Sequence, residues 1–154
     1  MIVDRTYSDV ERSKEILKKL KSLQSVSEKE YDILERGTVT YNTLNRIENK
    51  QKELAEILKQ WTYLIVPITN KSWTKNDIFN ETDLERLANN TIALREAFYV
   101  IDKSQPNPKA KYTYQDINAM EKILDEIDRL VAVTKTSFKR SNTFELGQNF
   151  VLPM

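Results

Sequence analysis

The chain has 154 residues with 24 basic and 23 acidic side chains, two glycines, no cysteine and no histidine. A chain of this length buries enough surface to fold as one domain without a disulfide or a structural metal. The lack of Cys and His excludes disulfides, thiolate and imidazole metal sites, and hydrolase mechanisms that need either residue. A net charge of +1 gives no overall attraction to nucleic acid or to an anionic membrane, so neither is an expected partner.

The hydropathy pattern shows neither a secretion signal nor a membrane span. Residues 1–5 lack the basic and then apolar layout of a signal peptide. No apolar run approaches the roughly 20 residues that a membrane-spanning helix needs. We therefore expect a protein that is made and kept in soluble form.

Four short segments share one pattern, in which a Thr or Asn precedes an Asp or Thr by three residues and an apolar residue follows. The side chain of the first residue can accept a hydrogen bond from a free backbone N–H at a helix start, and the side chain of the second can accept one from the backbone N–H of the first. The segments begin at Thr6, Thr40, Asn80 and Thr113, with spacings of 34, 40 and 33 residues. Because a helical solenoid has two helices per repeat and a steadier period, the pattern predicts one long helix after each start.

After each start the apolar residues recur at helical spacing, which predicts one buried face per helix. We expect long helices over residues 8–23, 41–60, 81–100 and 114–137, and a short helix that ends at Gly37. The inward side chains of the first helix are expected to be Val10, Leu17, Leu20 and Leu23. The predicted fold class is mainly all-α, a compact antiparallel bundle of four long helices plus a short helix.

Two apolar segments do not follow the helical period. Residues 63–68 are β-branched and apolar with a proline inside, which favours an extended segment or an edge strand. Residues 143–152 alternate loosely around a glycine, as in a hairpin or an irregular tail. We expect these segments to form a small extended or hairpin element. The predicted domains are a helical bundle over residues 1–137 and an extended C-terminal tail over residues 138–154.

The tail is apolar enough to need cover, either from the bundle or from another subunit. Its candidate partner-contact residues are Phe138, Phe144, Leu146, Phe150, Val151 and Leu152. Aromatic residues also interrupt the polar loop of residues 70–80, at Trp73 and Phe79. Because a large amphipathic ring readily fixes an irregular segment to a core, we expect both to act as loop anchors.

Three polar groupings could carry chemistry, and each has a simpler explanation. The groupings are the carboxylates Glu121, Asp125 and Asp128, the first-turn residues Tyr7, Tyr41 and Tyr114, and the basic Lys135, Lys139 and Arg140 beside Phe138. The carboxylates could bind a cation or act in acid–base catalysis, but a hydrated acidic face is the simpler interpretation. The tyrosines are expected to pack against neighbouring helices, and three basic residues would give only weak, salt-sensitive phosphate contact. We expect no catalytic, cofactor-binding or metal-binding residues.

One run of residues opens with Lys71-Ser72-Trp73-Thr74, continues through a polar stretch to Asp83-Leu84 and ends with Asn89-Asn90. This run resembles a motif of structural proteins from phages and prophages of Gram-positive bacteria. In the family the run opens Lys-Thr-Asp-Trp-Thr, so Ser72 replaces an Asp. Shorter similarities cover residues 4–10, 44–48, 117–124 and 138–147, although residues 144–147 differ from the family's aromatic-Ser-Gly ending.

The resemblance implies a non-enzymatic virion protein, an assembly or adaptor component of the tail, baseplate or fibre region. It also implies other virion proteins or further copies of the chain as partners, in an oligomeric assembly that forms after synthesis in the host cytoplasm. A capsid- or neck-associated virion protein is one alternative. Another is a cytoplasmic helical adaptor or regulator that binds its partner through the first helix. An enzyme that uses the three carboxylates is the remaining alternative.

Overall fold

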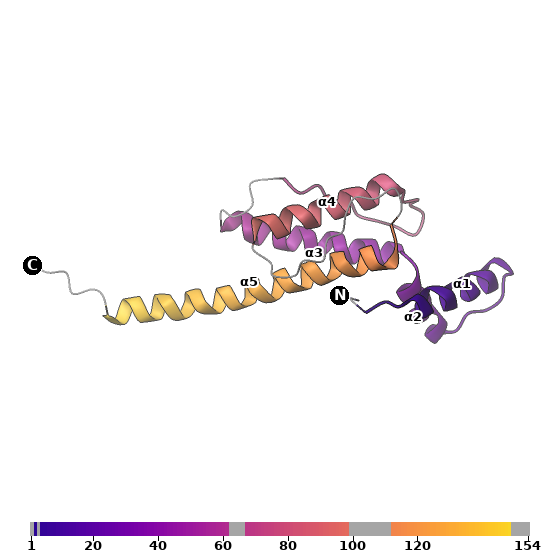
Figure 1. The fold of residues 1–154 in the computed structure, drawn as a ribbon, viewed down its shortest axis with the longest axis horizontal. Coiled ribbons are helices and arrows are strands. Elements are labelled where there is room, and N and C mark those ends of the chain that lie inside the picture. Colours follow the sequence, from indigo (N-terminus) through magenta and orange to yellow (C-terminus); the bar gives the residue numbers. More distant parts are fainter. Residues whose placement is uncertain (1, 3, 62–66, 99–111, 149–154) are drawn as a thin grey trace, which may run out of the picture.

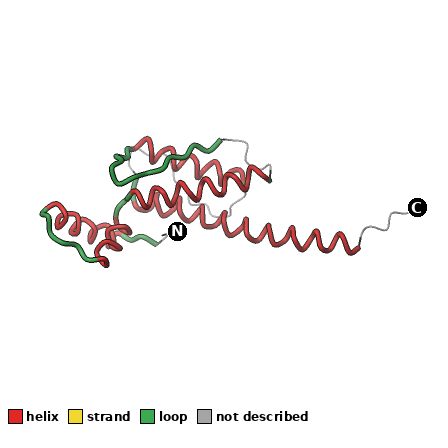
Figure 2. Tube along the Cα trace, turned by 180° about the vertical axis from the view of Figure 1, so that it is seen from behind, coloured by secondary structure: helices red, strands yellow, loops and turns green. Residues whose placement is uncertain are grey.

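The computed structural model describes residues 2, 4–61, 67–98 and 112–148, and their side chains only as far as Ser137. The described residues form five helices: α1 (Tyr7–Lys21), α2 (Glu28–Gly37), α3 (Tyr41–Gln60), α4 (Glu81–Ala97) and α5 (Tyr114–Gln148). No strand occurs in this part of the chain (Figure 2). The predicted all-helical fold, with four long helices and one short helix, is confirmed. None of the helices that the structure describes is both long and apolar enough to cross a membrane.

The helices form two parts (Figure 1). α3, α4 and α5 pack on one another as a three-helix bundle, and α1 and α2 pair as a hairpin at the end of the bundle where α5 begins. The main apolar core lies inside the bundle, and its buried residues come from α3, α4, α5 and the loop residue Trp73. The long helix α1 therefore pairs with α2 instead of contributing a fourth layer to that core.

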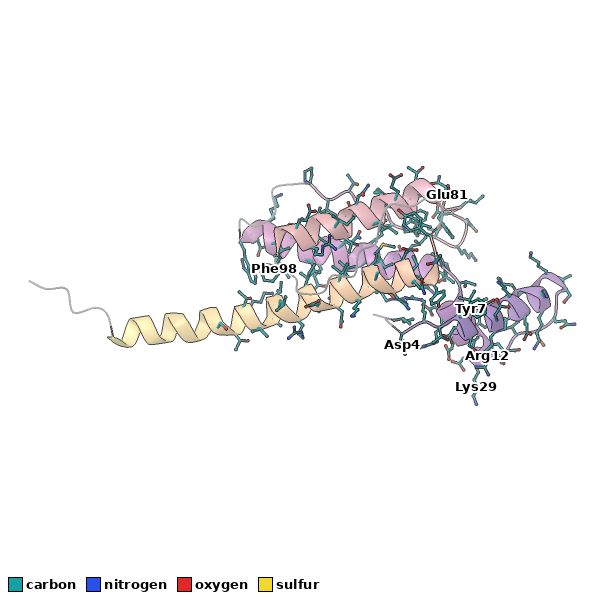
Figure 3. All side chains as sticks on the ribbon, viewed as in Figure 1. Asp4, Tyr7, Arg12, Lys29, Glu81 and Phe98 are labelled. Atoms are coloured by element: carbon teal, nitrogen blue, oxygen red, sulfur yellow. The ribbon has the colours of Figure 1, made fainter. Side chains whose placement is uncertain are left out.

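The three bundle helices run in the same direction, so the predicted antiparallel arrangement is wrong for them. Arg86 near the start of α4 bonds to Glu48 near the start of α3, and Phe98 after α4 lies 6.3 Å from Trp61 after α3, ring centre to ring centre. Figure 3 places Glu81 and Phe98 at opposite ends of α4, with Glu81 at the end of the bundle that is nearer the hairpin. Short loops force neighbouring helices to be antiparallel. The connections here, over residues 61–80 and 98–113, are long enough to return past a 20-residue helix of about 30 Å.

The four predicted helix starts are real caps. Thr6, Thr40 and Asn80 each accept from the backbone N–H three residues on, at the starts of α1, α3 and α4. Before α5, Asp116 accepts from the backbone N–H of Thr113 at 2.8 Å. Each cap satisfies a backbone group that the helix itself leaves unbonded, and this explains why the helices begin where the pattern places them.

α5 continues well beyond the predicted end at Ser137. It runs as one helix to Gln148, so the extended tail predicted over residues 138–154 and the hairpin predicted over 143–152 are wrong for residues up to 148. Helical spacing and loose alternation are hard to distinguish in a short apolar segment, and the helix already formed upstream propagates without a new nucleation cost. Residues 149–154 and most of the segment 63–68 lie outside the described residues, while Pro67 and Ile68 belong to a loop.

The hairpin buries only part of the face of α1 that the sequence predicts, since Val10 and Leu20 are half-buried but Leu17 and Leu23 are exposed. Ile16 is only 5% exposed, whereas Leu17 is 37% and Leu23 is 95% exposed. The residues of α1 that are buried, Ser13 and Ile16, are three positions apart and face α2. One short partner helix covers a narrower stripe than a bundle does, so the outer leucines stay in solvent.

Candidate functional site

A cluster of buried charges joins the hairpin to the bundle. Glu121 of α5 is completely buried, and one of its carboxylate oxygens accepts from Arg5, which precedes α1. The other oxygen accepts from Arg46 Nε of α3 at 2.7 Å, and Arg46 Nη1 donates to Glu35 of α2 at 3.1 Å. Three segments that are far apart in the sequence therefore meet at one carboxylate, whose negative charge is compensated by two guanidinium groups, and Arg46 links α2 to them.

Arg5 is fixed in this cluster on several sides. Its backbone N–H donates to Asn118 Oδ1 at 3.3 Å, and Asn118 Nδ2 donates to the Arg5 carbonyl at 2.9 Å. Arg5 Nη1 also bonds to Asn118 Oδ1, at 3.2 Å. The Arg5 side chain is only 2% exposed, and its Nη2 atom is buried without a hydrogen-bond partner. The cluster therefore holds at least one buried donor that lacks an acceptor.

A cavity of about 500 Å³ lies at the junction between the hairpin and the bundle. Its lining includes Arg5, α1, the end of α2 with residues 38–39, the first turn of α4 and the start of α5. Three lining residues are cationic, namely Arg5, Lys14 and Arg36, and none of the lining residues is acidic. The remaining lining is largely apolar or aromatic. This combination is typical of sites for small molecules, in which an apolar wall surrounds a few polar groups.

Close packing of α1 on α2 depends on Gly37. A Cβ atom added at this position would lie 2.1 Å from the carbonyl oxygen of Asp9 and 2.4 Å from the hydroxyl oxygen of Ser13. These distances are shorter than van der Waals contact, so a larger residue would push the two helices apart. Gly37 thus sets the geometry of the hairpin and of the cavity wall that it shares.

Carboxylates at the two caps of the hairpin are stabilised in their charged form. A hydrogen bond from the Thr6 backbone N–H lowers the pKa of Asp9, with further help from the Thr6 hydroxyl and from Arg36. A hydrogen bond from Lys19 and then the Ser27 backbone N–H lower the pKa of Glu30 to about 2. Both groups therefore support the hairpin as anions.

A second buried carboxylate, Glu48, fastens the loop of residues 67–80 to α3. Trp73 Nε1 donates to Glu48 at 3.1 Å, and Arg86 of α4 bonds to both oxygens of the same carboxylate. Trp73 is also paired through its backbone with Asn45, whose amide donates to the Trp73 carbonyl and accepts from the Trp73 N–H, both at 2.8 Å. Trp73 is only 4% exposed, as expected of a loop anchor, whereas Phe79 remains 37% exposed and does not fill that role.

The predicted carboxylate grouping does not form one site. Glu121 is buried in ion pairs, which corrects the interpretation of a hydrated face for this residue. Asp128 pairs with Lys50 at 3.3 Å, and Asp125 is exposed. No group of three or more acidic side chains is placed to hold a metal ion within the described part of the chain.

The first-turn tyrosines do not share a packing role, which corrects the second interpretation. Tyr7 is 64% and Tyr41 is 42% exposed, while Tyr7 and Tyr114 both line the junction cavity. Lys135 is exposed on α5. The side chains of Phe138, Lys139 and Arg140 lie outside the described residues, so the basic patch stays a prediction.

The predicted contact segment belongs, as far as Gln148, to a helix that leaves the bundle. Val131 is the last residue of α5 in the apolar core, and Figures 1 and 2 show the helix continuing alone past the ends of α3 and α4. Phe138, Phe144 and Leu146 lie on this projecting part, whereas Phe150, Val151 and Leu152 lie outside the described residues. Their role as partner contacts, and the domain division at residues 137–138, stay predictions, although α5 crosses that division without a break.

The sequence alone does not predict the buried cluster around Arg5 and Asn118 or the cavity beside it. Nothing local in the sequence marks Arg5 or Asn118, because their partners are distant in the chain. Comparison of the chain with protein-family models, with curated proteins and with solved structures finds no match.

Proposed function

We propose that this chain is a non-enzymatic structural protein of a phage virion, an assembly or adaptor component of the tail, baseplate or fibre region. The observation that carries the proposal is the projection of α5 beyond its own bundle. Residues 132–148 would extend about 25 Å at the usual helical rise. A rigid body with one protruding helix is suited to joining neighbouring proteins.

The projecting helix has little reason to be stable alone. Most helical stability in proteins comes from tertiary packing of one face, and the described part of the bundle supplies no such packing past the ends of α3 and α4 (Figure 1). Among the described side chains after Val131, Val133 is 53% exposed. A partner that covers Val133 and the apolar residues Phe138, Phe144 and Leu146 would stabilise it. The partner would be another virion protein or a further copy of the chain.

The arrangement of polar groups supports a role without catalysis. The two glutamates that are buried among the described residues, Glu48 and Glu121, are committed to ion pairs with arginine. A carboxylate held in such pairs is poorly suited to accept a proton from a substrate. The sequence supplies neither histidine nor cysteine as a substitute.

The placement in a virion rests on the resemblance of residues 71–90 to phage structural proteins. These residues form the Trp73 loop and the first half of α4, which Glu48 fastens to α3. The motif therefore has a structural purpose in this chain, namely to hold the loop against the bundle. A capsid or neck position in the virion would use the same features.

A cytoplasmic helical adaptor is the second candidate, and exposed apolar residues of the hairpin favour it. Leu17, Leu23 and Tyr31 are 37%, 95% and 53% exposed on α1, its C-terminal end and α2. Exposed apolar side chains such as these can dock a partner helix. In that case the hairpin, and not α5, would carry the contact.

The two candidate functions predict that association depends on different parts of the chain, either the projecting end of α5 or the hairpin. We would compare the full chain with a chain shortened after Ser137, using light scattering across a concentration series and occupancy in purified particles. The virion proposal expects the shortened chain to remain folded by circular dichroism but to lose self-association or incorporation. The matched control is Leu23→Asp in the full chain, which should leave both unchanged. If the control abolishes association and the shortened chain does not, the adaptor candidate is favoured and the role of α5 is wrong.

A further inference from the structure

We propose that the junction cavity binds a small organic acid that carries a single carboxylate on an aromatic or branched apolar body. This inference concerns a ligand site and goes beyond the proposed assembly function. It depends on three observations, namely the shape and lining of the cavity, an unsatisfied buried donor beside it, and the charges that surround it.

The cavity is large enough and apolar enough for the body of such a ligand. Its volume of about 500 Å³ lies within the usual range of small-molecule sites, roughly 300–1,000 Å³. Val10, Val39, Leu84 and Ile117 give it apolar walls, and the rings of Tyr7 and Tyr114 line it as well. Apolar and aromatic walls favour a ring or a branched chain, since both bury area there.

Arg5 offers a hydrogen-bond donor to the carboxylate of the ligand. Arg5 lines the cavity, its side chain is 2% exposed, and its Nη2 atom is buried without a hydrogen-bond partner. A buried donor without an acceptor is costly, so a ligand oxygen at this atom would gain a charge-assisted hydrogen bond and remove that cost. Asn118 and Glu121 accept hydrogen bonds from Nη1 of the same guanidinium. Because Nη2 is covered, the guanidinium or a neighbouring side chain has to shift for a ligand oxygen to reach it.

The direction of the bundle helices adds to the attraction for an anion. α4 and α5 both begin at this end of the molecule, and Thr113, Tyr114 and Leu84 from their starts line the cavity. The N-terminal end of a helix carries partial positive charge. Asp83 and Asp116 already cap these two ends with carboxylates, so the helix ends add only a small part of the attraction and Arg5 carries most of it.

The surrounding ion pairs favour one negative charge over two. Lys14 is paired with Glu11, and Arg36 is paired with Asp4 and Asp9. Arg5 Nη1 is occupied by Glu121, so Arg5 cannot offer both of its terminal nitrogens to a phosphate. A doubly charged group would also lie close to the carboxylates of those pairs. A monocarboxylate therefore matches the site better than a phosphate.

The test is a titration of the full chain with phenylacetate, followed by two-dimensional amide NMR. We expect shifts confined to the cavity lining, including the amides of Thr38, Val39 and Tyr114, with a Kd of about 1 mM or lower for so small a probe. Phenylacetamide, acetate and inorganic phosphate should each bind at least tenfold more weakly. Phenylacetamide lacks the negative charge, acetate lacks the apolar body, and phosphate has no apolar body and carries more than one charge. Absent shifts, shifts elsewhere, or equal binding of phenylacetamide would overturn the proposal.

Two substitutions locate the binding. Arg5→Lys keeps a positive charge but removes the Nη2 donor, and at least a tenfold loss in affinity is expected. Because Arg5 also pairs with Glu121, that variant can disturb the fold, so Tyr7→Ala provides a second test at an exposed wall residue. Tyr7→Ala should lower the affinity for phenylacetate at least threefold without changing the melting temperature. Leu17→Ala, on the same helix but outside the lining, should leave the affinity unchanged. Unchanged affinity in Tyr7→Ala would contradict the assignment.

Discussion

The hairpin and the three-helix bundle are stabilised by different kinds of interaction. The bundle buries an apolar cluster in which Ile47, Leu58, Leu87 and several residues of α5 are completely inaccessible. The hairpin buries Ser13 and Ile16 from α1 and no residue of α2. Caps, surface ion pairs and the close approach at Gly37 hold its two helices together, and the Glu121 cluster ties it to the bundle.

This difference indicates where the molecule opens first. Apolar burial contributes roughly 25 cal/mol per Å², and exposed ion pairs typically contribute only about 0–1 kcal/mol each. Segments with few buried apolar contacts open locally at lower free energy than the core does. We therefore expect the hairpin to open before the bundle, and the four predictions below test this order from the largest effect to the smallest.

Glu121→Gln removes the charge of the carboxylate that links the hairpin to the bundle. It leaves Arg5 and Arg46 without their shared negative charge, and breaking a buried ion pair in this way typically costs about 3–5 kcal/mol. We expect that loss in the free energy of unfolding measured with urea, together with faster amide exchange throughout α1 and α2. Asp125→Asn, at an exposed position one turn away, is the control and should change stability by less than about 0.5 kcal/mol. A loss no larger than that of the control would show that the cluster does not link the two parts.

Leu87→Ala tests whether a truncation in the core of the bundle affects a different part of the molecule from a truncation in the hairpin. Leu87 is completely buried in α4, and truncation of such a leucine costs about 2–5 kcal/mol through lost burial and the cavity that remains. Hydrogen exchange should accelerate together in α3, α4 and α5. Ile16→Ala, the matched change in the hairpin, should accelerate exchange only in α1 and α2. If Ile16→Ala loosened the bundle equally, the two parts would be one cooperative unit.

Gly37→Ala probes the contact between the two hairpin helices. The added methyl group would meet the Asp9 carbonyl and the Ser13 side chain, and overpacking of this kind costs about 1–3 kcal/mol. The expected result is a lower midpoint for loss of the hairpin's NMR signals on heating, with the bundle signals unaffected. Lys29→Ala on the same helix, at an exposed position, serves as the control. Stabilisation by Gly37→Ala would mean that the helices can separate at no cost.

Acid should open the hairpin gradually. The pKa of Asp9 and that of Glu30 are lower in the folded chain than their ordinary values of 3.8 and 4.5, and that of Glu30 falls to about 2. Their contribution is complete above the ordinary values and is lost as the pH falls through the folded ones, between about 4.5 and 2 for Glu30. Amide exchange in α1 and α2, corrected for its intrinsic pH dependence, should therefore rise over this interval.

The control for the acid effect is Glu30→Gln. This variant lacks the titrating group, so the part of the response due to Glu30 should disappear and only the part due to Asp9 should remain. An identical pH response in the variant would rule out Glu30 as the cause.

Local signals in the sequence predict much of this fold. The cap residues Thr6, Thr40, Asn80 and Thr113 mark four of the helix starts, because a cap involves residues only three positions apart. The buried faces of α3 and α5 likewise follow from helical spacing. Trp73 could be recognised as an anchor because a large ring in a polar loop has few other uses.

Features that depend on distant partners could not be predicted in the same way. The burial of Glu121 requires Arg5 and Arg46 to arrive from other segments, and a carboxylate is by default expected at the surface. The parallel course of the bundle depends on how long connections return, which periodicity does not record. The cavity depends on both, since it lies where the hairpin, the starts of α4 and α5, and Arg5 come together.

The continuity of α5 has a mechanical consequence. The same unbroken helix contributes Ile123, Leu124 and Ile127 to the core and then leaves it. A pull on the projecting end would act along the helix axis, parallel to α3 and α4, so that many side-chain contacts would have to slip at once and not one after another. Force from a neighbour would therefore reach the whole bundle in shear, and the hairpin, at the opposite end, would lie outside its direct path (Figure 1).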